Sequence, residues 1–369
     1  MLIDIALVLA GLVLLILGGE ALVRGASTLA GKAGVSPLVI GLVVVSAATS
    51  APEFAVTIGA VLNGEPDLAV GNVVGSNIVN VLMILGLSAL VAPLIIQRQL
   101  VRFDIPVMLL LSVLLLLLSL DGKVDFIDGA LLLCALIAHT VVSIRMGKKE
   151  VASGKASQET LPLNSKPVPL WLAIVLLIVG IGLLVIGAQA LVTGAVSIAT
   201  AMGVSSLVIG LTVVAVGTSL PELATSLVAI RRGETDMAVG NVVGSNIFNI
   251  GMVLGLPAMI FGQGIPVADA AIAIDMPLMV ASALALLPIA FTGFIVARWE
   301  GALFVAMYTA YTLYLLLSST EHDAAVGFSS IMLWFVLPLI AATLIALTSY
   351  EIGLLRGRRI SDQTKGPYS

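Results

Sequence analysis

Two acidic side chains interrupt apolar stretches of this 369-residue chain at matching places. Glu53 lies in SAATSAPEFAVT (46–57) and Glu222 lies in AVGTSLPELATS (215–226). An ionisable side chain in such a stretch is costly in a bilayer, so it usually faces a cavity or a partner and marks a functional site. Two carboxylates that meet within a membrane would offer a binding site for cations.

The proline before each glutamate adds further oxygen ligands. Pro52 and Pro221 cannot donate to the carbonyl four residues back, and their rings crowd that turn. A helix kinked or unwound there would present backbone carbonyls of Ser46–Thr49 and Ala215–Thr218. Hydroxyl groups stand beside these carbonyls, on Thr49, Ser50, Thr218 and Ser219. An all-oxygen set of this kind suits hard cations such as Ca²⁺ and Na⁺, whereas soft metals favour His or Cys.

A decamer, AVGNVVGSNI, occurs without change at 69–78 and 238–247. Ser76 and Asn80 stand one helical turn apart and share a face, as do Ser245 and Asn249. We expect these faces to form the other walls of the cation site. Small residues let neighbouring helices approach closely in membranes, and the decamers place four glycines for this: Gly71, Gly75, Gly240 and Gly244.

The decamers belong to a longer internal repeat. Residues 36–89 and 205–258 align without gaps at an offset of 169 positions, and 33 of the 54 pairs are identical. Each repeat is predicted to hold five membrane spans. Because five is odd, the second copy enters the membrane with the opposite orientation, which is the inverted-repeat architecture of secondary transporters. Their substrate sites lie near the midplane, where the repeats meet.

Composition supports a polytopic helical membrane protein. The chain is 60% hydrophobic and 10% charged, whereas a soluble domain carries about 25% charged residues. The predicted fold is all-α, with two inverted five-helix repeats (ten spans) and one additional C-terminal helix. The expected spans are 2–22, 35–62, 67–92, 104–120, 125–146, 169–190, 204–230, 236–261, 270–291, 299–318 and 327–350.

Orientation follows from the positive-inside rule. One set of alternate loops and tails holds sixteen Lys and Arg residues, and the other holds only Lys123. This predicts a multi-pass protein of the inner or plasma membrane, with the N-terminus outside and the central linker and C-terminus cytoplasmic. The first apolar segment is read as a retained span. The expected units are an N-terminal half (1–146), a linker (147–168), a C-terminal half (169–318), an extra helix (327–350) and a tail (351–369).

The repeated motifs resemble the alpha-repeats of the sodium/calcium exchanger family, within the calcium/cation antiporter superfamily. The resemblance rests on SAATSAPE and AVGTSLPE, followed by GNVVGSNIVN and GNVVGSNIFN, and covers spans one to ten. It implies a secondary antiporter that exchanges Na⁺ for Ca²⁺ by alternating access. The first and sixth spans would slide across the rest of the bundle.

The resemblance also implies roles for individual residues. Glu53 and Glu222 would be shared by one Ca²⁺ or by competing Na⁺ ions, with Asn80 and Asn249 at the centre. Two peripheral Na⁺ sites would lie beside these residues, one formed by each repeat. The ligands of the first would be Thr49, Ser50, Ser76 and the Ser46 carbonyl. The ligands of the second would be Thr218, Ser219, Ser245 and the Ala215 carbonyl.

This chain departs from the family pattern at two positions, and the first of them leaves the coupling ion open. Many members carry Asp where this chain has Asn249, so a K⁺-dependent or H⁺/Ca²⁺ exchanger of the same fold remains an alternative. The first motif has Ala48 where glycine is commoner, which predicts less unwinding there than near Gly217.

Other classes of function fit less well. A cation channel usually builds an acidic ring by oligomerisation, whereas one chain here supplies both halves of the site. No zinc or phosphate-binding motif points to an intramembrane enzyme or an ATP-driven pump. We therefore expect no cofactor, no nucleic acid and no protein partner, with a monomer working in the lipid bilayer. His139 and His322 are expected to be incidental, and Glu20 and Arg24 to form a local i,i+4 ion pair.

Overall fold

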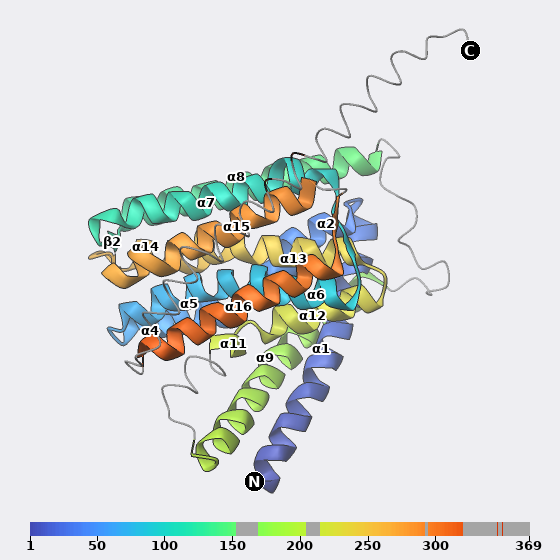
Figure 1. Ribbon diagram of the computed structural model, residues 1–369. Helices are drawn as coiled ribbons and strands as arrows, with labels where there is room; N and C mark the ends of the chain where they lie inside the picture. The colour runs from blue at the N-terminus through green and yellow to red at the C-terminus, as the bar shows by residue number, and fades with distance from the viewer. Residues whose placement is uncertain (153–168, 204–214, 292–293, 320–344, 346–348, 350–369) are drawn as a thin grey trace.

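The computed structural model describes residues 1–152, 169–203, 215–291 and 294–319, with the single positions 345 and 349. This part of the chain is largely helical, and most of its helices run roughly parallel in one bundle (Figure 1). By length and composition, seven described helices could cross a membrane, or eight if a pair bent by 40° counts as one span.

Four long helices are uninterrupted: α1 (Leu2–Ala33), α8 (Phe126–Ala152), α9 (Leu170–Ala201) and α16 (Arg298–Ser319). The other spans are assembled from shorter helices with π-helical segments between or before them. In the N-terminal half these are α2 (Pro37–Ile40), π segment Gly41–Val45, α3 (Ser46–Thr49), α4 (Ala51–Leu62), α5 (Pro66–Ile78), π segment Val79–Leu85, α6 (Gly86–Val91), π segment Leu100–Asp104 and α7 (Ile105–Leu118). In the C-terminal half they are α11 (Ala215–Gly217), α12 (Leu220–Arg231), α13 (Thr235–Phe248), π segment Asn249–Leu254, α14 (Gly255–Ile260), π segment Ala271–Asp275 and α15 (Met276–Phe291).

The first and sixth spans are longer than expected. The predicted ends at residues 22 and 190 were wrong, because the helices continue to Ala33 and Ala201. Apolar character weakens after those positions, but alanine-rich sequence keeps good helix propensity. Gly34, at φ 64°, then ends α1 in the left-handed conformation that glycine adopts without strain.

Helices α1 and α9 lie side by side and run obliquely to the bundle (Figure 1). They are antiparallel and their backbones touch at glycines. A Cβ on Gly11 would lie 2.7 Å from the Gly187 carbonyl oxygen, and one on Gly18 would lie 2.9 Å from that of Gly180. Such contacts let two helices pack closely without interlocking side chains.

Short strands tie the two halves together at both ends of the bundle. Strand β1 (Leu94–Ile95) pairs antiparallel with β4 (Ile295–Val296), and β2 (Lys123–Val124) pairs antiparallel with β3 (Ile265–Pro266). Each pairing joins one strand from each half.

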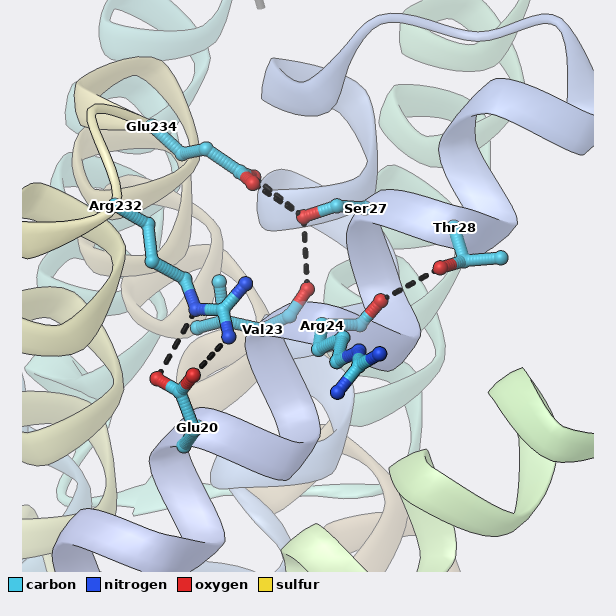
Figure 2. A network of polar contacts seen from close by, with 7 residues as sticks. All are labelled: Glu20, Val23, Arg24, Ser27, Thr28, Arg232 and Glu234. Carbon is cyan, nitrogen blue, oxygen red and sulfur yellow. Dashed lines mark hydrogen bonds and ion pairs between the residues drawn. The ribbon is translucent and has the colours of Figure 1, made fainter. Parts of the chain in front are cut away.

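Polar contacts fasten α1 to the turn between α12 and α13 (Figure 2). Arg232 forms an ion pair with Glu20, and the Ser27 hydroxyl lies 2.7 and 2.5 Å from the two carboxylate oxygens of Glu234. The expected Glu20–Arg24 pair is therefore wrong. The close approach of α12 supplies Glu20 with a guanidinium from the other half of the chain.

The prediction that the decamer glycines allow close helix packing is confirmed for the second decamer, residues 238–247. A Cβ on Gly240 would lie 2.8 Å from the Leu38 carbonyl oxygen, and one on Gly244 would lie 2.4 Å from that of Leu42. No described atom lies within 4 Å of a Cβ built on Gly71 or Gly75. The repeat places positions 207 and 211, the equivalents of Leu38 and Leu42, beside these two glycines. Both positions lie outside the described residues, so close packing at the first decamer stays a prediction.

Several other predictions fall on parts that the structure does not describe. These are the start of the span expected at 204–230, most of the linker, His322, and nearly all of the extra helix and tail. The division into units at 146, 168 and 318 also stays a prediction.

Candidate cation site

Each glutamate sits at the first turn of a helix that follows a break. The second span bends by 40° where α3 meets α4 at Ser50, and α12 begins after the turn formed by Thr218 and Ser219. Both helices carry their proline at the second position, where a missing N–H is tolerated. The predicted interruption of both helices before the glutamates is confirmed.

The two breaks differ in the expected direction. In the first, the Ser50 amide still donates to the Ser46 carbonyl at 2.9 Å, so one residue leaves the helix. In the second, the Ser219 amide donates to the Val216 carbonyl at 3.1 Å, and two residues leave it. The Ser46 carbonyl also accepts from Thr49 Oγ1 at 3.5 Å, so it already has two hydrogen-bond donors. This corrects the expectation of a free carbonyl there.

Glu53 and Glu222 are completely buried. Ser219 Oγ lies 3.4 Å from Glu53 Oε1, and Ser245 Oγ lies 3.5 Å from Glu222 Oε1. Thr49 Oγ1 lies 3.4 Å from Ser245 Oγ, beside Glu222. The second carboxylate oxygen of each glutamate has no hydrogen-bond partner.

Thr49 Oγ1 lies 3.5 Å from the Ser46 carbonyl, as in the expected first group, and further hydroxyl contacts cross between the two expected groups. Thr49 lies with Ser245 of the other half, and Ser219 and Thr218 contact Glu53. The breaks of the two halves face one another, so hydroxyls reach across the interface. Ser50 and Ser76 are buried, and Ser50 Oγ has no hydrogen-bond partner. Ala215 begins α11.

Four asparagines cross the centre of the site. Asn80 Nδ2 donates to Asn246 Oδ1 at 3.0 Å, and Asn249 Nδ2 donates to Asn77 Oδ1 at 3.1 Å. The oxygens Asn80 Oδ1 and Asn249 Oδ1 are buried without a partner. Both residues lie in π-helical segments, which are frequent at functional sites.

Two further amides of the repeat support the site from outside. Asn72 Nδ2 donates to the Glu53 carbonyl and to Thr57 Oγ1, both at 3.0 Å. Asn241 Oδ1 accepts from Thr49 Oγ1 at 3.3 Å. The sequence did not predict these contacts, because the partners of both asparagines belong to other helices.

The groups that could bind an ion at this site are all oxygen ligands. The set brings together carboxylate, hydroxyl and amide oxygens, and no group of three or more His, Cys, Asp or Glu residues occurs in the described part of the chain. Unpaired buried oxygens are costly unless something compensates them. A hard cation would supply that compensation, whereas a transition metal would find no nitrogen or sulfur ligand among these residues.

The chain matches a known protein family over most of its length. The family model "Sodium/calcium exchanger protein" matches residues 3–145 and 172–317. The chain belongs to the sodium/calcium exchanger family.

Several family members are similar over most of the chain. The putative antiporter CaxA of Alkalimonas amylolytica is 40% identical over 322 residues, 86% of this chain and 100% of that protein. The inner membrane protein YrbG of Escherichia coli (strain K12) is 39% identical over 267 residues, 70% of this chain and 81% of that protein. A structure of the sodium-calcium exchanger NCX_Mj, soaked with Na⁺ and without Ca²⁺, matches with a TM-score of 0.71 and 33% identity, covering 84% of this chain and 97% of that one. This chain is thus a multi-pass helical membrane protein of a cation/Ca²⁺ antiporter family, which is a family of transporters and not of enzymes.

Proposed function

We propose that this protein exchanges Na⁺ for Ca²⁺ by alternating access, with Glu53 and Glu222 binding the ions. The observation that carries the proposal is a set of four buried oxygens without hydrogen-bond partners, two from each half: Glu53 Oε2, Asn80 Oδ1, Glu222 Oε2 and Asn249 Oδ1. The proposed ligand set also includes the oxygens of Ser46, Thr49, Ser50, Ser76, Ala215, Thr218, Ser219 and Ser245.

The proposed architecture is two inverted repeats of five spans, followed by an eleventh helix. The strand pairings support it, since each sheet joins a strand of one half to the non-equivalent strand of the other. Glycine contacts repeat the pattern. Gly86 packs against Gly301, and Gly255 packs against Gly129.

The proposed moving part is the pair formed by α1 and α9. These helices share close backbone contacts and meet the bundle obliquely. We infer that they slide together across α12 and its counterpart, which opens the site to one side of the membrane at a time. One chain supplies both halves of the site, so a monomer suffices.

The proposed orientation places the N-terminus outside and the linker and C-terminus in the cytoplasm of an inner or plasma membrane. The distribution of Lys and Arg supports it. An H⁺/Ca²⁺ or K⁺-dependent exchanger is the second candidate, because Asn249 leaves the centre with two carboxylates and two amides.

The test is Ca²⁺ uptake into proteoliposomes loaded with Na⁺ and diluted into Na⁺-free medium. Wild-type protein should take up Ca²⁺ with the Na⁺ gradient, and Glu53→Gln should reduce uptake to background. Truncating one partner of a buried charge pair costs about 2–5 kcal/mol, so losing one carboxylate weakens Ca²⁺ binding by roughly two to three orders of magnitude.

Glu65→Gln is the matched control, since this exposed glutamate lies outside the site and should leave uptake unchanged. Uptake that follows a pH gradient or requires K⁺, and ignores Na⁺, would favour the second candidate. Wild-type uptake by a folded Glu53→Gln protein would refute the assignment of the site.

A further inference from the structure

Two asparagines that make no contribution to the proposed ligand set stand behind its centre. Asn77 and Asn246 occupy equivalent places in the two decamers, and both are buried. Each donates from Nδ2 to the backbone carbonyl of the other, at 3.3 Å for Asn77 and 3.4 Å for Asn246. Each Nδ2 also lies 3.5 Å from a methionine sulfur of the opposite half, Met279 for Asn77 and Met108 for Asn246.

These contacts fix which way the two carboxamides point. A backbone carbonyl only accepts hydrogen bonds, so the amide nitrogen and not the oxygen must face it. The oxygen of Asn77 is thereby turned toward Asn249, whose Nδ2 donates to it at 3.1 Å. The oxygen of Asn246 is turned toward Asn80, whose Nδ2 donates to it at 3.0 Å.

The consequence is a fixed orientation for Asn80 and Asn249. With their nitrogens held by Asn246 and Asn77, their oxygens are left without partners. The π segment that carries Asn249 packs against α4, which carries Glu53, and the segment that carries Asn80 packs against α12, which carries Glu222. Both carboxamides therefore have their oxygens, and not their nitrogens, free to face the centre of the site.

We propose that Asn77 and Asn246 are positioning residues that orient the carboxamide oxygens of Asn249 and Asn80 toward the transported ion, each acting across the interface between the two halves. This inference rests on the proposed function and goes beyond it, because it assigns a role to two residues that touch no ion. The arrangement makes each half set the ligand geometry of the other.

The test is a double-mutant cycle on Ca²⁺ affinity, measured as the concentration for half-maximal Na⁺-dependent uptake. Asn77→Leu removes the acceptor that holds Asn249 Nδ2, so the carboxamide can turn its nitrogen toward the ion. We expect Ca²⁺ affinity to fall about tenfold, because the loss of one hydrogen bond costs about 1 kcal/mol and about 1.4 kcal/mol corresponds to a factor of ten in affinity. The carboxylate of Asn249→Asp presents oxygen in either orientation, so in that background Asn77→Leu should have little further effect.

A purely structural role for Asn77 predicts equal losses in both backgrounds, which would overturn the proposal. Asn77→Asp keeps an acceptor for Asn249 Nδ2 but loses the donor to the Asn246 carbonyl, so it should retain more Ca²⁺ affinity than Asn77→Leu. This variant also keeps the test decisive if the Asn77→Leu protein does not fold. Equal affinity in the wild type and in folded Asn77→Leu would also refute the role. Absence of Na⁺-dependent uptake in the wild type itself would instead count against the proposed function.

Discussion

The hydrogen bonds that the two buried glutamates accept from serine hydroxyls are long, at 3.4 and 3.5 Å. A carboxylate that accepts short bonds from several donors is satisfied and has little to gain from an ion. Here one oxygen of each carboxylate has no donor. Unsatisfied acceptors at this depth favour occupancy by a cation.

Asp104 is also completely buried, but protein groups satisfy its hydrogen bonding. Asp104 Oδ1 lies 2.8 Å from His139 Nε2 and 2.8 Å from Ser143 Oγ, and His139 stacks on Phe103. The expectation that His139 is incidental was wrong, because this histidine has a structural role. The histidine ties α8 to the start of α7 and completes the hydrogen bonding of a buried aspartate.

We therefore expect His139→Ala to destabilise the protein by about 3 kcal/mol, because it leaves Asp104 buried with fewer partners. Thermal unfolding in detergent measures this as a lowered Tm. Cys134→Ala, an exposed position on the same helix, is the control and should leave Tm nearly unchanged. An equal Tm for His139→Ala and wild type would contradict the structural role.

Sequence patterns predicted the glutamates, the breaks before them and the asparagines, because these depend on residue types within one turn or one repeat. They did not predict the bond between Asn80 and Asn246 or the ion pair between Glu20 and Arg232. Those partners lie in opposite halves of the chain. Their contact depends on how the halves dock, which no local pattern encodes.

At the scale of elements, α1 contacts the α12–α13 turn through Ser27 and Glu234 (Figure 2). Ser27 has one hydroxyl proton, yet its oxygen lies near three acceptors, the Val23 carbonyl at 2.8 Å and both oxygens of Glu234. A protonated Glu234 resolves this conflict, since it donates to Ser27 while Ser27 donates to Val23. Burial raises the pKa of the Glu234 carboxyl, against the opposing effects of Ser27 and the Arg232 charge.

The raised pKa means that the folded protein holds this proton to a higher pH than the unfolded chain does. The stability that it contributes is present below the usual glutamate pKa of about 4.3 and is lost as pH rises through the folded value. We expect Tm to fall with rising pH in this window for wild type, and to fall less for Glu234→Gln, which keeps a neutral side chain.

Glu65→Gln, the equivalent exposed position in the first repeat, should retain the wild-type slope of Tm against pH. A Glu234→Gln protein with the wild-type slope would show that another group is responsible.

At the scale of the whole molecule, charge balance favours exchange over one-way transport. Two buried carboxylates bring a charge of −2, which one Ca²⁺ or two Na⁺ neutralise. An empty site would move bare negative charge through a low-dielectric barrier, so the loaded carrier crosses more easily. Both halves must contribute to that site, and the crossed contacts between them, from strand pairs to asparagines, hold the two glutamates together.

The central claim is that one shared site binds Ca²⁺ and Na⁺ in competition. Equilibrium binding of radioactive Ca²⁺ to the purified protein, at increasing Na⁺, tests it directly. We predict one Ca²⁺ bound per chain, displaced by Na⁺ with a Hill coefficient above one, and no binding to a folded protein that carries both Glu53→Gln and Glu222→Gln. Ca²⁺ binding that is indifferent to Na⁺, or that survives both substitutions, would contradict the account.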